Sequence, residues 1–365
     1  MRTTGLILTI TLLTGCTSLE ESRVESPHYK DGRFQNLYND DAIAGKSFFT
    51  VMRWKMFGPR DEPAVKNLPE KKIKAYQIAP QDLYARSDGV KITWIGHATA
   101  LITIRKGDKD TVLITDPVFK GIPFKARQVK LPLAKEKLPK VDYVIISHAH
   151  FDHTDSESLL FLQEQNKDIV YIFPEGFAAW ARDLGLNNIA TLAWWKNRQT
   201  DLAKVHALPA HHWGMRSVND RMQFHWASFV IETGYGDIYF AGDTGWSDHF
   251  ATIAKKFPKG FEAALMPIGA YSPRWFMKSA HINPPEAIRA NKVLNSRQLL
   301  PIHWGTFELA DEDITEPIYY LQAELQKLPQ PAMLWRPGVS YEFGVKSLTP
   351  PRAVVQADSK KSRAN

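Results

Sequence analysis

The sequence predicts an α/β (α+β) fold in which β-sheets are covered by helices. Short apolar runs rich in β-branched residues begin near Val90, and such runs are typical of buried strands. Runs of strands are followed by strand–helix alternation, and the last third of the chain repeats that alternation. The chain has 365 residues, of which 44% are hydrophobic, enough for a large core in one large domain or two.

The predicted elements follow local start and stop signals. Thr154 opens an S/T-x-x-E capping box ahead of one helix, and Gly185 ends the next. Strands are expected at 91–95, 100–104, 111–115, 141–146, 169–173, 189–193, 204–208, 226–232, 238–241, 263–266, 299–302 and 332–335. Further helices are expected at about 175–184, 247–256, 284–294 and 317–328. We expect one domain over 90–348 and a disordered tail over 349–365.

The first 15 residues are predicted to be a signal peptide. Arg2 supplies a positive charge, residues 5–13 are an apolar run too short to cross a bilayer, and Cys16 follows Leu-Thr-Gly. This pattern resembles a bacterial lipoprotein signal, which predicts an acylated Cys16 and a tether over 16–45. Thr17 in place of Asp favours an outer-membrane location facing the periplasm, and an ordinary secretory signal is the alternative. Cys16 is the only cysteine, so neither an intramolecular disulfide nor a catalytic thiol is expected.

Residues 46–89 are predicted to be an amphipathic helix followed by an extended strap. Phe48, Phe49, Met52 and Met56 fall at helical spacing, with basic residues between them. One hypothesis places this helix among the headgroups of a membrane, and the other packs it on the main domain. Residues 58–88 hold four prolines, which favour an extended path into the domain.

Four potential metal ligands lie within six residues of one loop. His148 and His150 are two apart in extended chain, so their rings project to the same side, and Asp152 and His153 follow at the turn into the helix. Imidazole nitrogens and carboxylate oxygens suit zinc, and also iron or manganese. The loop follows the carboxyl end of a predicted strand, the usual place for a site in an α/β fold. The spacing therefore predicts a metal site with room for a second ion.

Three more candidate ligands follow predicted strands farther along the chain. They are His211 or His212 before a tryptophan, Asp243 between glycines, and His303 before another tryptophan. Singly each is weak, because a histidine at a strand end is more often a hydrogen-bonded loop residue. Together, and in this order after the His-x-His-x-Asp-His motif, the three residues are a specific signal of a metal site.

With these motifs the chain resembles the metallo-β-lactamase superfamily, and within it the phospholipases D that hydrolyse N-acylphosphatidylethanolamine. The ligand motifs carry the first resemblance. The shared stretches include TWIGHAT (93–99) and LITDPVF (113–119), and the second resemblance depends on PIGAYSPRWFM (267–277) and on HWGTF within IHWGTF (302–307). The expected architecture over residues 90–343 is therefore the αββα sandwich, two mixed sheets with helices on the outer faces.

The resemblance implies that seven side chains hold two divalent metal ions, for which zinc is the first candidate. One ion is assigned to His148, His150 and His212, the second to Asp152, His153 and His303, and the bridge to Asp243. His212 is preferred to His211 because the ligand of the family directly precedes a tryptophan. The resemblance also implies that His281 lies near the substrate phosphate. His97 and Asp116 are expected to orient the ligands or the first sheet rather than to bind metal themselves.

The implied reaction is hydrolysis of a phosphodiester. A water activated by the two ions attacks phosphorus, which releases an N-acylethanolamine and leaves phosphatidic acid. Asp152 is the candidate for orienting that water. Arg274 and His281 are candidates for holding the phosphate or protonating the leaving oxygen.

Two other functions fit the sequence. One is a hydrolase of the same fold for a small soluble substrate, such as a sugar-phosphate lactone or a general phosphodiester. The other is a zinc-binding envelope lipoprotein without activity, against which the full ligand set argues. The expected partners are a phospholipid and a membrane, because the basic residues behind the net charge of +7 are spread along the chain rather than gathered as in nucleic-acid-binding proteins. The oligomeric state is left open, a homodimer included.

Overall fold

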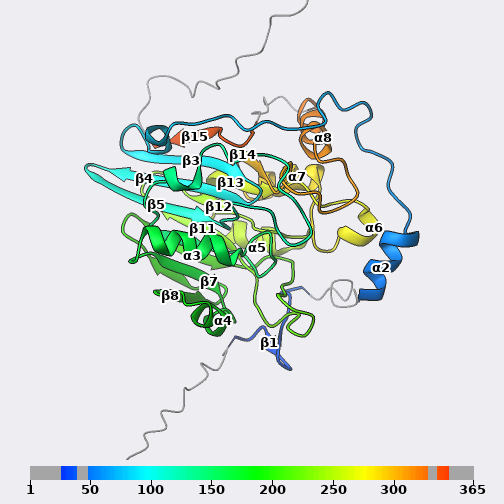
Figure 1. The fold of residues 1–365 in the computed structure, drawn as a ribbon, viewed down its shortest axis with the longest axis horizontal. Helices are drawn as coiled ribbons and strands as arrows, with labels where there is room; N and C mark the ends of the chain where they lie inside the picture. Colours follow the sequence, from blue (N-terminus) through cyan, green and yellow to red (C-terminus); the bar gives the residue numbers. More distant parts are fainter. Residues whose placement is uncertain (1–25, 39–47, 328–334, 345–365) are drawn as a thin grey trace, which may run out of the picture.

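The protein is an αββα sandwich, as the sequence predicted. The computed structural model describes residues 26–38, 48–327 and 335–344. Two β-sheets pack face to face and helices cover their outer faces (Figure 1). The predicted signal peptide, Cys16, most of the strand at 332–335 and the tail at 349–365 lie outside the described residues.

The first sheet has seven strands and contributes the loop with the clustered histidines. Its strands, in spatial order, are β15 (Ser340–Phe343), β3 (Gly89–Gly96), β4 (Thr99–Lys106), β5 (Lys109–Thr115), β6 (Tyr143–Ile145), β7 (Val170–Pro174) and β8 (Ile189–Leu192). Strands β15 to β5 pair antiparallel, and β5 to β8 pair parallel. All eight residues of β3 are buried, because the second sheet covers one face of this sheet and helices and loops cover the other.

The second sheet has six strands. They are, in spatial order, β14 (Ser296–Ile302), β13 (Phe261–Pro267), β12 (Ile238–Phe240), β11 (Ser228–Thr233), β10 (Ala203–Leu208) and β9 (Asn197–Gln199). Strands β12 to β14 are parallel, and β9 to β12 are antiparallel. The main core, with Trp94, Phe229 and Leu265, lies between the two sheets.

The helices lie in two layers. Helices α3 (Ser156–Gln165) and α4 (Ala178–Asp183) cover the first sheet, with Leu159 and Ala181 in a second apolar cluster. Helices α5 (His249–Lys256), α7 (Pro284–Val293) and α8 (Glu316–Leu325) cover the second. The short helices are α6 (Arg274–Met277), η1 (Pro80–Leu83) and η2 (Lys135–Lys137). No helix among the described residues is both long and apolar enough to cross a membrane.

The N-terminal segment differs from the predicted tether. Residues 26–38 pack on the domain and include the small hairpin of β1 (Tyr29–Lys30) and β2 (Arg33–Phe34). Phe34 is fully buried and stacks on His225, with ring centroids 4.2 Å apart. The polar composition of this stretch gave no indication that Phe34 is buried, because composition averages over residues while packing depends on individual side chains.

The predicted helix at 46–57 forms as α2 (Phe48–Phe57), and one side of it packs on the main domain. Trp54 is buried, stacks on Phe276 of α6 and donates its indole N–H to Asp311 at 2.7 Å. Met52, Met56 and Phe57 are instead exposed, at 41%, 60% and 78%. Trp54 therefore docks the helix on the domain, while Met52, Met56 and Phe57 face outward.

The start of α3 also differs in detail. The capping residue is Asp155, whose carboxylate accepts from the backbone N–H of Ser158, and not Thr154. The Thr154 hydroxyl donates instead to the backbone carbonyl of His148 at 2.6 Å. The cap thus moves by one residue, and the released hydroxyl helps to fix the loop that carries the histidines.

Candidate metal centre

The seven predicted ligands meet at the edge where the parallel strands of both sheets end. His148, His150, Asp152 and His153 lie on the loop between β6 and α3. The other three follow β10, β12 and β14, and are His212, Asp243 and His303. Parallel strands bring their carboxyl ends to one edge of a sheet, so residues far apart in sequence become neighbours there.

The ligand atoms form overlapping groups in which they lie within 4.8 Å of one another. One group is His148, His150 and His212, as assigned to the first ion. A second contains Asp152, His153 and His303, as assigned to the other ion, and His97 joins it. Asp243 lies between them, because it groups with His148 and His153 and also with His212 and His281. The structure thus brings together all seven side chains that the sequence selected.

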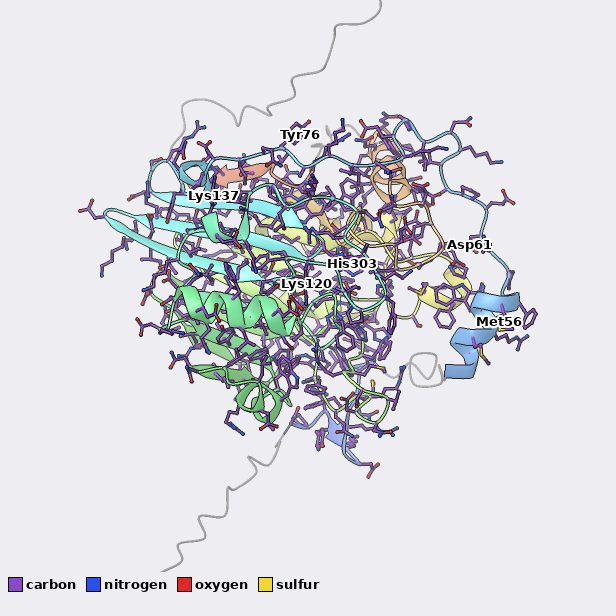
Figure 2. All side chains as sticks on the ribbon, viewed as in Figure 1. Met56, Asp61, Tyr76, Lys120, Lys137 and His303 are labelled. Carbon is purple, nitrogen blue, oxygen red and sulfur yellow. The ribbon has the colours of Figure 1, made fainter. Side chains whose placement is uncertain are left out.

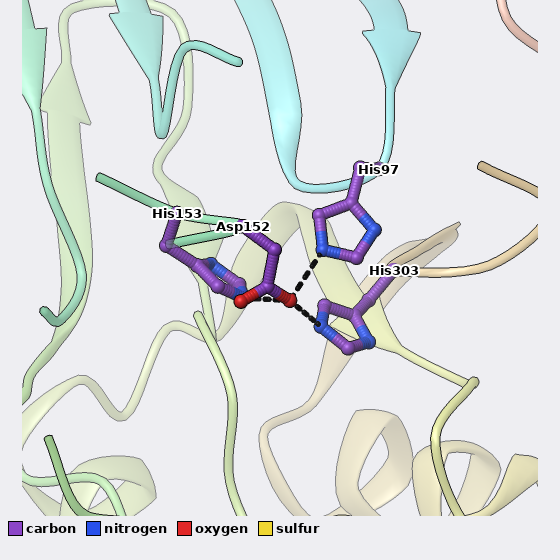
Figure 3. Close-up of side chains that lie close together, drawn as sticks. All are labelled: His97, Asp152, His153 and His303. Atoms are coloured by element: carbon purple, nitrogen blue, oxygen red, sulfur yellow. Dashed lines mark hydrogen bonds and ion pairs between the residues drawn. The ribbon is translucent and has the colours of Figure 1, made fainter. Parts of the chain in front are cut away.

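Asp152 and Asp243 are the two carboxylates that the histidines surround. Asp152 Oδ2 lies 3.4 Å from His303 Nε2 and 3.5 Å from His153 Nε2 (Figure 3). Asp243 Oδ2 lies 3.1 Å from His303 Nε2 and 3.3 Å from His153 Nε2. It is also 4.0 Å from His148 Nε2 and therefore faces both groups, as a bridging ligand must.

The donor atoms at this centre suit divalent cations. His153 Nε2, His303 Nε2 and Asp243 Oδ1 are buried and have no hydrogen-bond partner, and His150 turns its Nδ1 toward the Nε2 atoms of His148 and His212. Buried polar atoms are rarely left unpaired, since each costs about 1–3 kcal/mol. Imidazole and carboxylate together are the donor set of zinc, iron and manganese sites. The residues therefore fit two such ions.

Buried partners orient the ligand rings. The Asp116 carboxylate accepts from His153 Nδ1 at 2.7 Å and from the Ser147 hydroxyl and backbone N–H at 2.6 and 2.7 Å. His148 Nδ1 lies 2.9 Å from the Ser147 oxygen, and His212 Nδ1 donates to the Ala280 carbonyl at 3.0 Å. These bonds place the protons on Nδ1, which turns the Nε2 lone pairs toward the centre.

His97 supports the second group, as the sequence suggested. Its Nε2 lies 2.9 Å from Asp152 Oδ2, so it holds the carboxylate between His303 and His153 (Figure 3). His97 and His303 have left-handed backbones, with φ of 56° and 61°, and the His303 N–H donates to the His97 carbonyl at 2.9 Å. Such strained conformations are found mainly at functional sites, where the surrounding structure maintains them.

The charges in the centre are balanced internally. Burial lowers the pKa of His150 to about 4 and that of His97 to about 3, so both rings are neutral at pH 7. Burial alone would lower the pKa of His303 as well, but the negative charge of Asp243 and the short contacts of the ring with both carboxylates raise it to about 9. Burial likewise would raise the pKa of Asp243, yet His303 and His153 hold it well below its usual range. Without metal, protons on His153 and His303 thus neutralise the two carboxylates.

His281 lies at the centre, and Arg274 lies to one side of it. His281 Nδ1 is buried without a hydrogen-bond partner, 3.7 Å from Asp243 Oδ2. The Arg274 guanidinium donates to the His281 backbone carbonyl at 2.9 Å and to Glu286 at 2.8 Å. Arg274 also lines a cavity of about 910 Å³ with several carboxylates, among them Glu312 and Glu316, surroundings that disfavour a phosphate.

Sequence reasoning gave no role to Ser147 and assigned Thr154 only to the cap of the following helix. Both are small hydroxyl residues next to the ligands, and hydroxyls are common in any loop. The glycine before Asp243 carries a clearer signal: Gly242 has φ of 59°, and a Cβ there would lie 2.6 Å from the Cβ of Ser147. A glycine is therefore required where the Asp243 loop touches the histidine loop.

Comparison with known proteins agrees with this geometry. Residues 111–304 match the family model described as Beta-lactamase superfamily domain. The chain is 33% identical over 278 residues to N-acyl-phosphatidylethanolamine-hydrolyzing phospholipase D 1 of Caenorhabditis elegans, covering 71% of this chain and 74% of that protein. It is 35% identical over 237 residues to the mitochondrial N-acyl-phosphatidylethanolamine-hydrolyzing phospholipase D of Saccharomyces cerevisiae, covering 62% of this chain and 49% of that one.

Solved structures show the same fold at low identity. Igni18, a metallo hydrolase from Ignicoccus hospitalis, has a TM-score of 0.54 at 19% identity and covers 70% of this chain and 99% of its own. An isothiocyanate hydrolase from Delia radicum gut bacteria has a TM-score of 0.54 at 20% identity, with the same coverage of both chains. The chain belongs to the metallo-β-lactamase superfamily, in the family of the N-acyl-phosphatidylethanolamine-hydrolyzing phospholipases D, and is a metal-dependent hydrolase.

Proposed function

We propose that the protein is a dinuclear phosphodiesterase that hydrolyses N-acylphosphatidylethanolamine-type phospholipids to an N-acylethanolamine and phosphatidic acid. The observation that carries the proposal is the convergence of seven buried or partly buried ligand side chains, with Asp243 between the two groups. The proposed ligands of one ion are His148, His150 and His212, and those of the other are Asp152, His153 and His303, with Asp243 shared. Two divalent ions, zinc first, would lower the pKa of a water and neutralise phosphate oxygens.

The side chains around the ions have separate tasks. Asp152 is held by His97 on one oxygen, which fixes it where it can orient the attacking water. His281 lies near Asp243 with a ring nitrogen that has no partner, so it is the candidate for contacting the phosphate or the leaving oxygen. Arg274, bound to Glu286 and to the His281 carbonyl, holds the His281 loop rather than the phosphate.

The choice of a phospholipid substrate is supported by the relatives and by α2. The two phospholipase relatives share 33% and 35% identity with this chain. Met56 projects from α2 at the rim of the molecule, away from His303 at its centre (Figure 2). Phe57 and Trp275 of α6, exposed at 78% and 49%, extend this apolar surface, and Arg53 and Arg60 beside it are exposed. Apolar side chains flanked by arginines are the composition of surfaces that rest among anionic headgroups.

We further propose that the chain is anchored to the bacterial outer membrane through an acylated Cys16 and faces the periplasm. Between Cys16 and Ser26 the chain can span at most about 35 Å, at about 3.3–3.6 Å per residue. An anchor this short would keep the described domain close to the bilayer. Membrane attachment and substrate class therefore support each other.

Product analysis tests the proposed reaction. Purified, metal-loaded protein is incubated with mixed phospholipid vesicles that contain N-acylphosphatidylethanolamine, and the products are identified by mass spectrometry. Release of N-acylethanolamine together with phosphatidic acid is the expected result. Turnover of only soluble phosphodiesters or of a sugar-phosphate lactone would move the assignment to a small-substrate hydrolase of the same fold.

A further inference from the structure

We propose that Asn36, from the N-terminal segment, is a positioning residue for the metal ligand His212. Its side-chain amide binds both polar groups of the His212 backbone: Nδ2–H donates to the His212 carbonyl at 3.0 Å, and Oδ1 accepts from the His212 N–H at 3.1 Å. Oδ1 also accepts from the Trp226 indole N–H at 3.0 Å, which fixes the direction of the amide. The inference rests on the proposed role of His212 as a ligand.

The amide bonds matter because His212 lies in a loop. It follows β10 and precedes a stretch without regular structure, so no sheet or helix ladder fixes its backbone. Its ring is held at one nitrogen by the Ala280 carbonyl, while Nε2 lies 3.3 Å from His150 Nδ1 in the first ligand group. Asn36 holds the backbone and Ala280 holds the ring, and the two together fix the direction of Nε2.

Asn36 can act in this way because its own segment is firmly docked. Phe34, two residues earlier, is fully buried against His225, and its N–H donates to the Met222 carbonyl at 2.7 Å. Tyr38, two residues later, bonds the Thr252 hydroxyl of α5 at 2.7 Å. The segment thus contacts the domain both before and after Asn36. In sequence, Asn36 lies 176 residues from His212.

This arrangement links the anchored end of the chain to the metal centre. Residues 26–38 complete the first ion site by fixing one of its three histidines, although they contribute no ligand themselves. Loss of an outer partner of this kind typically costs about 10–100-fold in metal affinity. The ion held by Asp152, His153 and His303 does not depend on His212, so its affinity should remain.

Metal binding by the full-length chain tests the inference without use of any phospholipid. Zn²⁺ affinities are measured by competition with a chelator, and the ligand field of the Co²⁺-substituted protein is measured by visible absorption. We expect Asn36→Ala to lower the affinity for one Zn²⁺ ion by about 10–100-fold and to leave the affinity for the other within about threefold of wild type. The Co²⁺ spectrum of the weakened site should change as well. Tyr38→Phe, which removes a side-chain bond of the same segment without touching His212, should leave both affinities within about threefold.

A purely structural role would give a different pattern. In that case Asn36→Ala and Tyr38→Phe would both lower the unfolding temperature of the metal-free protein and leave both affinities unchanged, which would overturn the inference. Asn36→Asp provides a second variant of nearly the same shape, in which the donor to the His212 carbonyl is lost. It should weaken the same Zn²⁺ even though an added negative charge favours cations, and unchanged or tighter binding would contradict the proposal.

The measured Zn²⁺ affinities of the Asn36 variants do not depend on which substrate the protein hydrolyses. A wild-type chain that binds two ions but does not cleave N-acylphosphatidylethanolamine would refute the proposed reaction and leave the role of Asn36 intact. A wild-type chain that binds two ions and is unaffected by Asn36→Ala would refute the role of Asn36 alone. If the wild-type chain bound no ion, both would fail.

Discussion

The exposed face of α2 gives the most quantitative prediction about membrane binding. Met56 and Phe57 are exposed at 60% and 78%, and the buried Trp54 fixes the helix that carries them. Changing both to serine removes apolar surface without touching the contact of Trp54 with Phe276. A Cys16→Ser background removes the proposed lipid anchor, so that the contribution of α2 itself can be measured.

The expected magnitude follows from the exposed fractions. Complete burial of a Met or Phe side chain contributes about 1.5–3 kcal/mol. Scaled by their exposure, the two side chains together would contribute about 2–4 kcal/mol on insertion. At about 1.4 kcal/mol per factor of ten, the double change should weaken binding to vesicles by at least about 30-fold.

Co-sedimentation with anionic phospholipid vesicles measures this binding. The control is Phe124→Ser, because Phe124 is fully exposed on another loop, next to the bridge between Ile122 and Lys125. Activity on a detergent-dispersed substrate should be unchanged in all these variants. A loss of less than about threefold in the Met56 and Phe57 double variant, or an equal loss in Phe124→Ser, would refute α2 as the membrane-contacting surface.

Three further predictions concern the metal centre and the core. Asp243→Ala should abolish loading of both ions and hydrolysis, because Asp243 is proposed to be shared; metal analysis that still found two ions would contradict this. Asp116→Asn should weaken metal binding about 10–100-fold in a chelator titration, because an amide cannot accept every bond that the carboxylate accepts and the proton on His153 Nδ1 loses its partner. Burial lowers the pKa of His225 from 6.5 to about 4 in the folded protein. As the pH falls below 6.5, His225 therefore takes up a proton in the unfolded chain before it does so in the folded one. Stability should therefore fall by up to about 3 kcal/mol as the pH drops from 6.5 to 4, and His225→Gln should reduce that fall in urea unfolding.

The sandwich and the ligand set could be predicted because their signals are local. The loop at 148–153 places four ligand types within six residues directly after an apolar strand, a pattern that few other structures require. Asp243 and His303 follow similar apolar runs, and both lie at strand ends in the structure. Because the carboxyl ends of parallel strands lie at one edge of a sheet, these residues could be expected to lie together.

Long-range partners could not be predicted in the same way. Asn36 lies in a polar stretch, and nothing in its neighbours indicates a bond to a residue 176 positions away. Trp54 was not among the apolar residues expected to define α2, although it docks the helix on the domain, because helical spacing does not say which face meets the domain. The role of Arg274 also depended on partners, Glu286 and the His281 carbonyl, that only the fold brings near.

The most direct test of the account is to locate the metal ions themselves. Crystals of the metal-loaded protein, measured on both sides of the absorption edge of zinc, give the positions of bound ions by anomalous scattering. Two peaks are expected, one among His148, His150 and His212 and one among Asp152, His153 and His303, with Asp243 contacting both. A single peak, or peaks outside these side chains, would contradict this expectation.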